Sequence, residues 1–184
     1  MIKWFMRRQL AAFERNWNYD APYLRDLVEA DPRAAMAFAK VTGLSTYRKD
    51  VPPAAYFAAK IIATMAEDCG PCTQLMVDMA ERAGVDAITL RSIITGDVEN
   101  MPEDAALAAG FADASLRHAP EAEAMREEIV RRWGPRALVS LTFALVAARI
   151  FPTARYAMGH GQSCMRITVG GESRPVLQAV EKAA

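Results

Sequence analysis

The sequence predicts an all-α protein, folded as one bundle of many helices. Apolar residues recur at helical spacing through most of the chain. Prolines and acidic residues stand where helices are expected to begin, and glycines stand where they are expected to end. No segment pair has the pattern of a β-hairpin, so none is expected. With 184 residues and 52% hydrophobic content, the chain is long enough to build one domain with its own core.

The first fifty residues predict a helical extension. Residues 2–17 carry an apolar, partly aromatic stripe at helical spacing. Asp20 caps a short helix, and Asp31 followed by Pro32 begins another that reaches about Thr46. A single compact core need not bury the stripe on residues 2–17, so we expect this extension to take part in oligomerisation.

The rest of the chain follows the same punctuation. Helices are expected over residues 54–66, 71–83, 86–96, 102–118 and 120–133. Residues 136–151 are apolar on nearly all sides, which predicts a buried central helix that Pro152 stops. The glycine-rich stretch 159–171 is weakly specified.

Composition excludes several classes of function. The 22 lysines and arginines equal the 22 aspartates and glutamates, so no net field attracts nucleic acid or an anionic membrane. The longest uncharged run, residues 137–148, is shorter than the roughly 20 residues that span a bilayer. No signal peptide is evident, so we expect a cytoplasmic protein without membrane contact. Nothing in the sequence predicts a bound cofactor.

The sharpest chemical feature is the dithiol Cys69-Gly70-Pro71-Cys72, whose second cysteine falls in the first turn of a predicted helix. The positive end of the helix dipole stabilises a thiolate there. A free thiol of pKa about 8.5 is only slightly ionised at neutral pH, whereas a pKa near 7 makes it about half ionised. The three-residue offset also brings the two cysteines close enough to form a disulfide. The spacing therefore favours thiol-disulfide chemistry.

Three other interpretations of the two cysteines remain. They are consistent with two buried, inert thiols. They also form half of a Cys3His zinc set with His160 and Cys164, although the spacing of the second pair is unusual for zinc. Finally, the loop is similar to that of thioredoxin, but helical patterns on both sides disfavour the alternating strands and helices of that fold.

The helical context resembles the AhpD-like superfamily, the alkylhydroperoxidase D and carboxymuconolactone decarboxylase group. The resemblance rests on the alanine-rich helix from Ala54 and on the segments Glu67–Cys72, Ala80–Val85, Ile94–Gly96 and Met101–Asp104. It implies one AhpD-like helical domain over residues 1–184, with residues 1–50 as the extension. In this family the second cysteine attacks a peroxide and the first resolves the product, which assigns these roles to Cys72 and Cys69. A small peroxide or disulfide substrate, a thiol reductant protein and a homo-oligomer are implied as well.

The chain departs from the family pattern at its proton relay. The histidine four residues after the second cysteine is Met76 here, and the glutamate twelve residues before the first is Phe57. We expect Met76 to be core packing beside the thiol, since a thioether cannot move a proton. Lys60, Glu67 and Asp68 are the candidate supporting groups that lie near enough in sequence.

The two histidines receive no catalytic role. His118 falls at a predicted helix C-terminus, where capping is expected, and the glycines around His160 and Cys164 argue against a helix that would align them.

Two hypotheses of function remain. The first is a dithiol oxidoreductase of the alkylhydroperoxidase type. The alternative is a non-catalytic oligomeric scaffold, or a small-ligand-binding member of the fold, that has lost the relay. Lactone decarboxylation is disfavoured, because the relatives that perform it resemble proteins without the paired cysteines.

Overall fold

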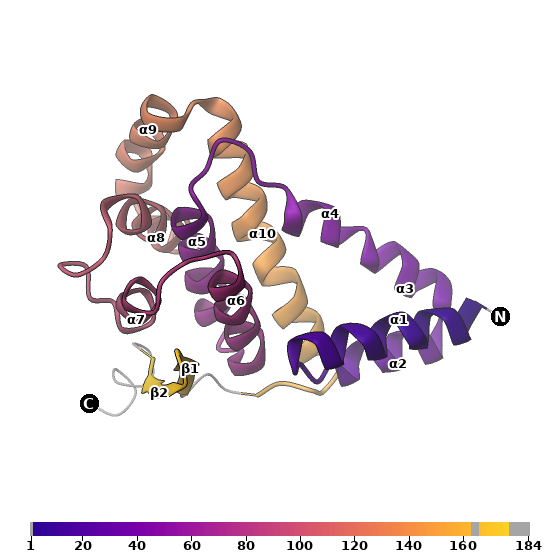
Figure 1. Ribbon diagram of the computed structural model, residues 1–184. Coiled ribbons are helices and arrows are strands. Elements are labelled where there is room, and N and C mark those ends of the chain that lie inside the picture. Colours follow the sequence, from indigo (N-terminus) through magenta and orange to yellow (C-terminus); the bar gives the residue numbers. More distant parts are fainter. Residues whose placement is uncertain (1, 163–165, 177–184) are drawn as a thin grey trace.

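A computed structural model describes residues 2–162 and 166–176 and confirms the all-α class (Figure 1). The helices, in chain order, are α1 (Ile2–Trp17), α2 (Pro22–Ala30), α3 (Pro32–Ala39), α4 (Val41–Thr46), α5 (Pro53–Ala66), α6 (Gly70–Arg82), α7 (Ala87–Thr95), α8 (Glu103–Leu116), α9 (Glu121–Trp133) and α10 (Pro135–Ala157). The helix expected from Pro32 to Thr46 is divided into α3 and α4 at Lys40.

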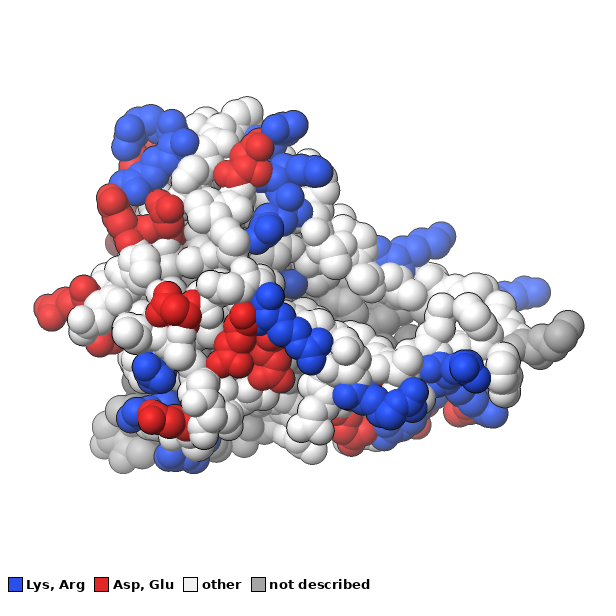
Figure 2. Space-filling view, viewed as in Figure 1, with Lys and Arg blue, Asp and Glu red and all other residues white. Residues whose placement is uncertain are grey.

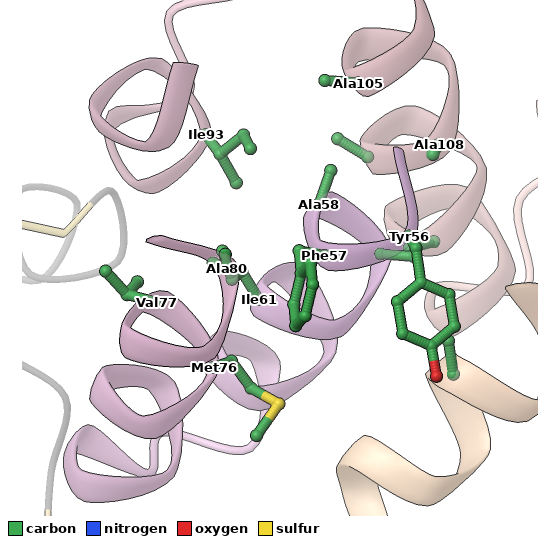
Figure 3. Packing of buried hydrophobic residues seen from close by; sticks show 14 of the residues in the cluster. Tyr56, Phe57, Ala58, Ile61, Met76, Val77, Ala80, Ile93, Ala105 and Ala108 are labelled. Atoms are coloured by element: carbon green, nitrogen blue, oxygen red, sulfur yellow. The ribbon is translucent and has the colours of Figure 1, made fainter. Parts of the chain in front are cut away.

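Helix α5 lies at the centre of the bundle and packs against α6, α8 and α10. Most of its residues are buried, because its alanines let neighbouring backbones approach closely. Figure 3 shows Phe57 and Ala58 of α5 in the same packed core as Ala105 and Ala108 of α8 and Met76 of α6. The predicted alanine-rich helix before the dithiol is therefore the core of the fold.

Helices α1 to α4 form an arm that reaches away from the rest of the bundle (Figure 1). None of the residues of α1 is fully buried, and the side chain of Trp4 is 64% exposed. Residues 2–17 thus form the predicted helix, and the apolar side chains near its N-terminus are exposed. Positive and negative side chains are interspersed over the face in Figure 2, as expected for a net charge of zero.

The sequence predicted that the last helix stops at Pro152. Helix α10 instead continues through Pro152 to Ala157. The proline removes one backbone hydrogen bond, and the burial of its side chain offsets that loss. Within the described residues, α10 alone is long and apolar enough to cross a membrane by length and composition. This is weak evidence for a span, because core helices of soluble proteins have the same properties. Helix α10 packs against α4, α5 and α9.

The expectation of no β-hairpin was wrong. Strands β1 (Arg166–Val169) and β2 (Glu172–Pro175) pair antiparallel in the stretch near the C-terminus. Gly170 and Gly171 join them with φ of 57° and 81°, as the two-residue hairpin turn requires. Four residues per strand are too few to show a clear alternation, which is why periodicity missed them. The Gln74 side chain on α6 anchors the hairpin through the backbone of Thr168, at 2.8 and 2.9 Å.

Candidate functional site

The site is built around the N-terminus of α6. Cys69 is the N-cap residue of this helix, and its carbonyl accepts a hydrogen bond from the Thr73 amide at 2.9 Å. Cys72 follows in the first turn, and the two cysteines form a disulfide with a Cα–Cα distance of 5.3 Å. The predicted pairing of this motif at a helix start is confirmed.

The two sulfurs have different surroundings. Cys69 is completely buried, and Cys72 is 3% exposed. Cys72 lines a large cavity, whereas Cys69 does not border it. A small molecule in the cavity therefore meets Cys72 first.

The cavity has a volume of about 410 Å³ and lies between the arm and helices α5, α6 and α10. Its walls are mostly apolar, formed by residues such as Leu10, Phe13, Leu24, Phe38, Met79 and Phe151. A few polar side chains interrupt the apolar lining, among them Ser45, Lys60 and Thr64. Burial raises the pKa of the Tyr23 hydroxyl, which also lines the cavity, so this group stays neutral.

Lys60 is the predicted supporting residue that borders the same cavity as Cys72. Its side chain is 3% exposed, and its Nζ donates to the carbonyl oxygen and the Oγ of Ser45, at 3.0 and 3.1 Å. The ammonium also lies 5.3 Å from the ring centre of Tyr56 and 5.8 Å from that of Phe57. Burial lowers the pKa of Lys60 to about 8.

Sequence reasoning missed two polar groups beside the disulfide. The Tyr19 hydroxyl lies 3.8 Å from Cys72 Sγ. It accepts a hydrogen bond from Arg155 Nη1 at 3.5 Å, and the same nitrogen donates to the Asp20 carbonyl at 2.8 Å. Arg155 is 1% exposed, and its Nε donates to the His160 carbonyl at 2.8 Å. The Tyr19 phenol thus lies beside the cavity-facing sulfur, and the buried Arg155 cation contacts the far side of that phenol.

The other two candidate supporting residues, Glu67 and Asp68, lie outside the cavity that Cys72 borders. Glu67 forms an ion pair with Arg149 on α10 at 2.5 Å and accepts from the Thr153 hydroxyl at 3.4 Å. Asp68 lies in the turn between α5 and α6 with a φ of 50°, and its carbonyl accepts from the Tyr156 hydroxyl at 3.2 Å. Neither residue lines the cavity that Cys72 borders.

Met76 is apolar core beside Cys72, as predicted, and Phe57 at the other missing relay position is buried in the core as well. Phe57 is 9% and Met76 is 8% exposed, and Met76 lines the cavity beside Cys72. His118 is exposed just after the end of α8.

The fourth member of the hypothetical zinc set, Cys164, lies outside the described residues. His160 Nε2 is 2.7 Å from the Asp26 carboxylate. Over residues 2–162 and 166–176, no group of three histidine, cysteine, aspartate or glutamate side chains is placed to hold a metal ion.

Comparisons with protein-family models, curated proteins and solved structures gave no match. Function must therefore be argued from the site itself.

Proposed function

We propose that this protein is a dithiol oxidoreductase of the alkylhydroperoxidase type, and a divergent member of the AhpD-like superfamily. The observation that carries the proposal is the placement of the dithiol. Cys72 borders an apolar cavity from the first turn of α6, and Cys69 lies buried behind it within disulfide distance. This arrangement favours Cys72 as the attacking sulfur and Cys69 as the resolving one.

Three features support a reactive Cys72 thiolate. The N-terminus of α6 presents amides and the positive end of the helix dipole. Arg155 supplies a buried positive charge, which is linked to the Cys72 sulfur through the Tyr19 hydroxyl. Cys72 and Arg155 are themselves 3% and 1% exposed, so little solvent screens either interaction.

The reaction has two steps. The Cys72 thiolate attacks the outer oxygen of a hydroperoxide, the O–O bond breaks, and the leaving alkoxide takes a proton to become an alcohol. The Cys69 thiol then attacks the Cys72 sulfenic acid, so that an S–S bond forms and water leaves. The peroxide is reduced by two electrons and the dithiol is oxidised by two. A thiol reductant, expected to be a protein, resets the disulfide by exchange.

Tyr19 takes the place of the missing relay in this scheme. Its hydroxyl accepts from Arg155, which leaves its own proton available to the two other groups beside it, Cys72 Sγ and the Tyr23 hydroxyl. On the Cys72 side, Tyr19 donates the proton that the alkoxide needs. General acid help of this kind contributes about 10²- to 10⁴-fold in rate.

The proposal is tested by mass spectrometry of the peptide that holds both cysteines. The reduced protein is mixed with one equivalent of an organic hydroperoxide and then alkylated. We expect the wild-type peptide to lose two hydrogens, Cys72→Ser to stay reduced, and Cys69→Ser to accumulate a sulfenic acid. A wild-type pair that remains fully alkylatable would overturn the proposal.

A ligand-binding scaffold without catalysis is the second candidate, and the apolar side chains at the relay positions favour it. Phe57 and Met76 are packed into the core and move no proton. The pH dependence of thiol alkylation separates the two functions. A Cys72 pKa near the 8.5 or so of free cysteine would favour the scaffold, and a lower value the enzyme.

We also propose that the protein is a cytoplasmic homo-oligomer, with α1 at the subunit contact. Ile2, Trp4 and Phe5 are 49%, 64% and 54% exposed on this helix, an apolar surface that a second copy would cover. Light scattering after size-exclusion chromatography tests this. A monomer at micromolar concentration would contradict it.

A further inference from the structure

Lys60 is a buried cation with no opposite charge beside it. Its ammonium has two acceptors, both from Ser45, and it forms no ion pair with any residue in 2–162 or 166–176. The rings of Tyr56 and Phe57 contribute only weak cation–π attraction. Burying a charge without a counter-charge is costly, and a buried titratable group at the wall of a cavity is a candidate binding residue.

The cavity that Lys60 borders is the size and character of a small-molecule site. Such sites hold about 300–1,000 Å³, are mainly apolar and contain few polar groups. The cavity volume of about 410 Å³ lies within this range. Apart from Lys60 itself and the amide of Gln9, the polar lining consists of hydroxyl groups, including those of Ser45 and Thr64, and the other walls are mainly apolar.

We propose that this cavity binds a medium-chain monocarboxylic acid, with its apolar tail between the arm and the bundle and its carboxylate on Lys60. A single lysine with neutral hydroxyl neighbours matches one negative charge, whereas a dianionic phosphate would retain an unpaired charge in an apolar site. Binding of the acid does not need the thiols. A further step, in which the bound acid itself bears a hydroperoxide group that Cys72 reduces, rests on the proposed function.

The test is isothermal titration calorimetry with decanoate and with decanol, which have the same tail and differ in the charged head. The oxidised wild-type protein is expected to bind decanoate about 10- to 100-fold more tightly than decanol, the range for hydrogen bonds to charged groups. Equal affinity for the two, or no binding of decanoate, would overturn the proposal without any substitution being made.

The variant Lys60→Met tests whether the Lys60 ammonium is the positive charge that binds the carboxylate. We expect it to lose the preference for decanoate and to keep the affinity for decanol. Lys49→Met, at an exposed lysine of the nearby connection, is the matched control and should behave as wild type. A Lys60→Met protein that keeps the full preference for decanoate would contradict the assignment.

A double variant, Cys69→Ser with Cys72→Ser, separates this inference from the proposed function. It should bind decanoate without any redox chemistry. Decanoate binding by a wild-type protein whose thiols do not react with peroxide would overturn only the oxidoreductase. Reactive thiols in a protein that does not bind decanoate would overturn only the acid site.

Discussion

The cost of burying Lys60 should be visible in the pH dependence of stability. Folding lowers the pKa of this lysine from its ordinary value of 10.5 to about 8, because burial disfavours the charged form. At about 1.4 kcal/mol per pKa unit, the charged amine costs the fold about 3 kcal/mol at pH 7. Between about pH 8 and 10.5 the unfolded chain binds more protons at this site than the native protein. Stability contributed by Lys60 therefore rises with pH across that window.

Replacing Lys60 with methionine isolates this effect. The free energy of unfolding is measured in urea at pH 7 and at pH 9.5, with the disulfide intact. The advantage of Lys60→Met over wild type should be about 2 kcal/mol smaller at pH 9.5 than at pH 7. Packing differences and the lost hydrogen bonds are the same at both pH values and cancel. The Ser45 carbonyl keeps a partner in the variant, since it also accepts from the Tyr56 hydroxyl at 2.7 Å.

The control is again Lys49→Met, because Lys49 is exposed and should give the same difference from wild type at both pH values. If the difference in unfolding free energy between Lys60→Met and wild type is also the same at both pH values, the reasoning is refuted. It would mean that the Lys60 amine is hydrated in solution, and the argument for an anionic ligand would lose its basis.

Three further substitutions probe the site and the hairpin. Tyr19→Phe should slow the reaction of the reduced protein with hydroperoxide about 100-fold in stopped-flow experiments, and an unchanged rate would remove Tyr19 as the proton donor. Arg155→Met should slow alkylation of the cavity-facing thiol at pH 7, while Arg149→Met on the same helix should not; equal rates would deny Arg155 its electrostatic role. Gly170→Ala, at a φ of 57°, should lower the free energy of unfolding by about 1–2 kcal/mol. Gly43→Ala has open space and should not destabilise α4, so similar losses in both would contradict the turn geometry.

Local patterns predicted the helices because caps, prolines and apolar spacing act within a few residues. Where tertiary packing competes with a local rule, the prediction failed. Pro152 normally ends a helix, yet its burial in the bundle outweighs one lost hydrogen bond. Gly170 and Gly171 carry the turn signal of the hairpin, but its strands are too short for periodicity to support it.

The candidate site was predictable only where its chemistry is local. Cys69 and Cys72 are three residues apart and belong to one helix start, so their pairing follows from the sequence. Tyr19 and Arg155 are 136 positions apart and meet only through the packing of the arm on α10. The sequence signal for Arg155, a lone cation in an apolar stretch, was hidden because the helix was expected to end before it.

The central claim is that the chain turns over hydroperoxide through Cys72. The most direct measurement is steady-state consumption of an organic hydroperoxide with excess dithiothreitol as the dithiol reductant, comparing wild type with Cys72→Ser. The account predicts catalytic consumption by the wild-type protein and only the uncatalysed background rate with the variant. Equal consumption by the two proteins would contradict it.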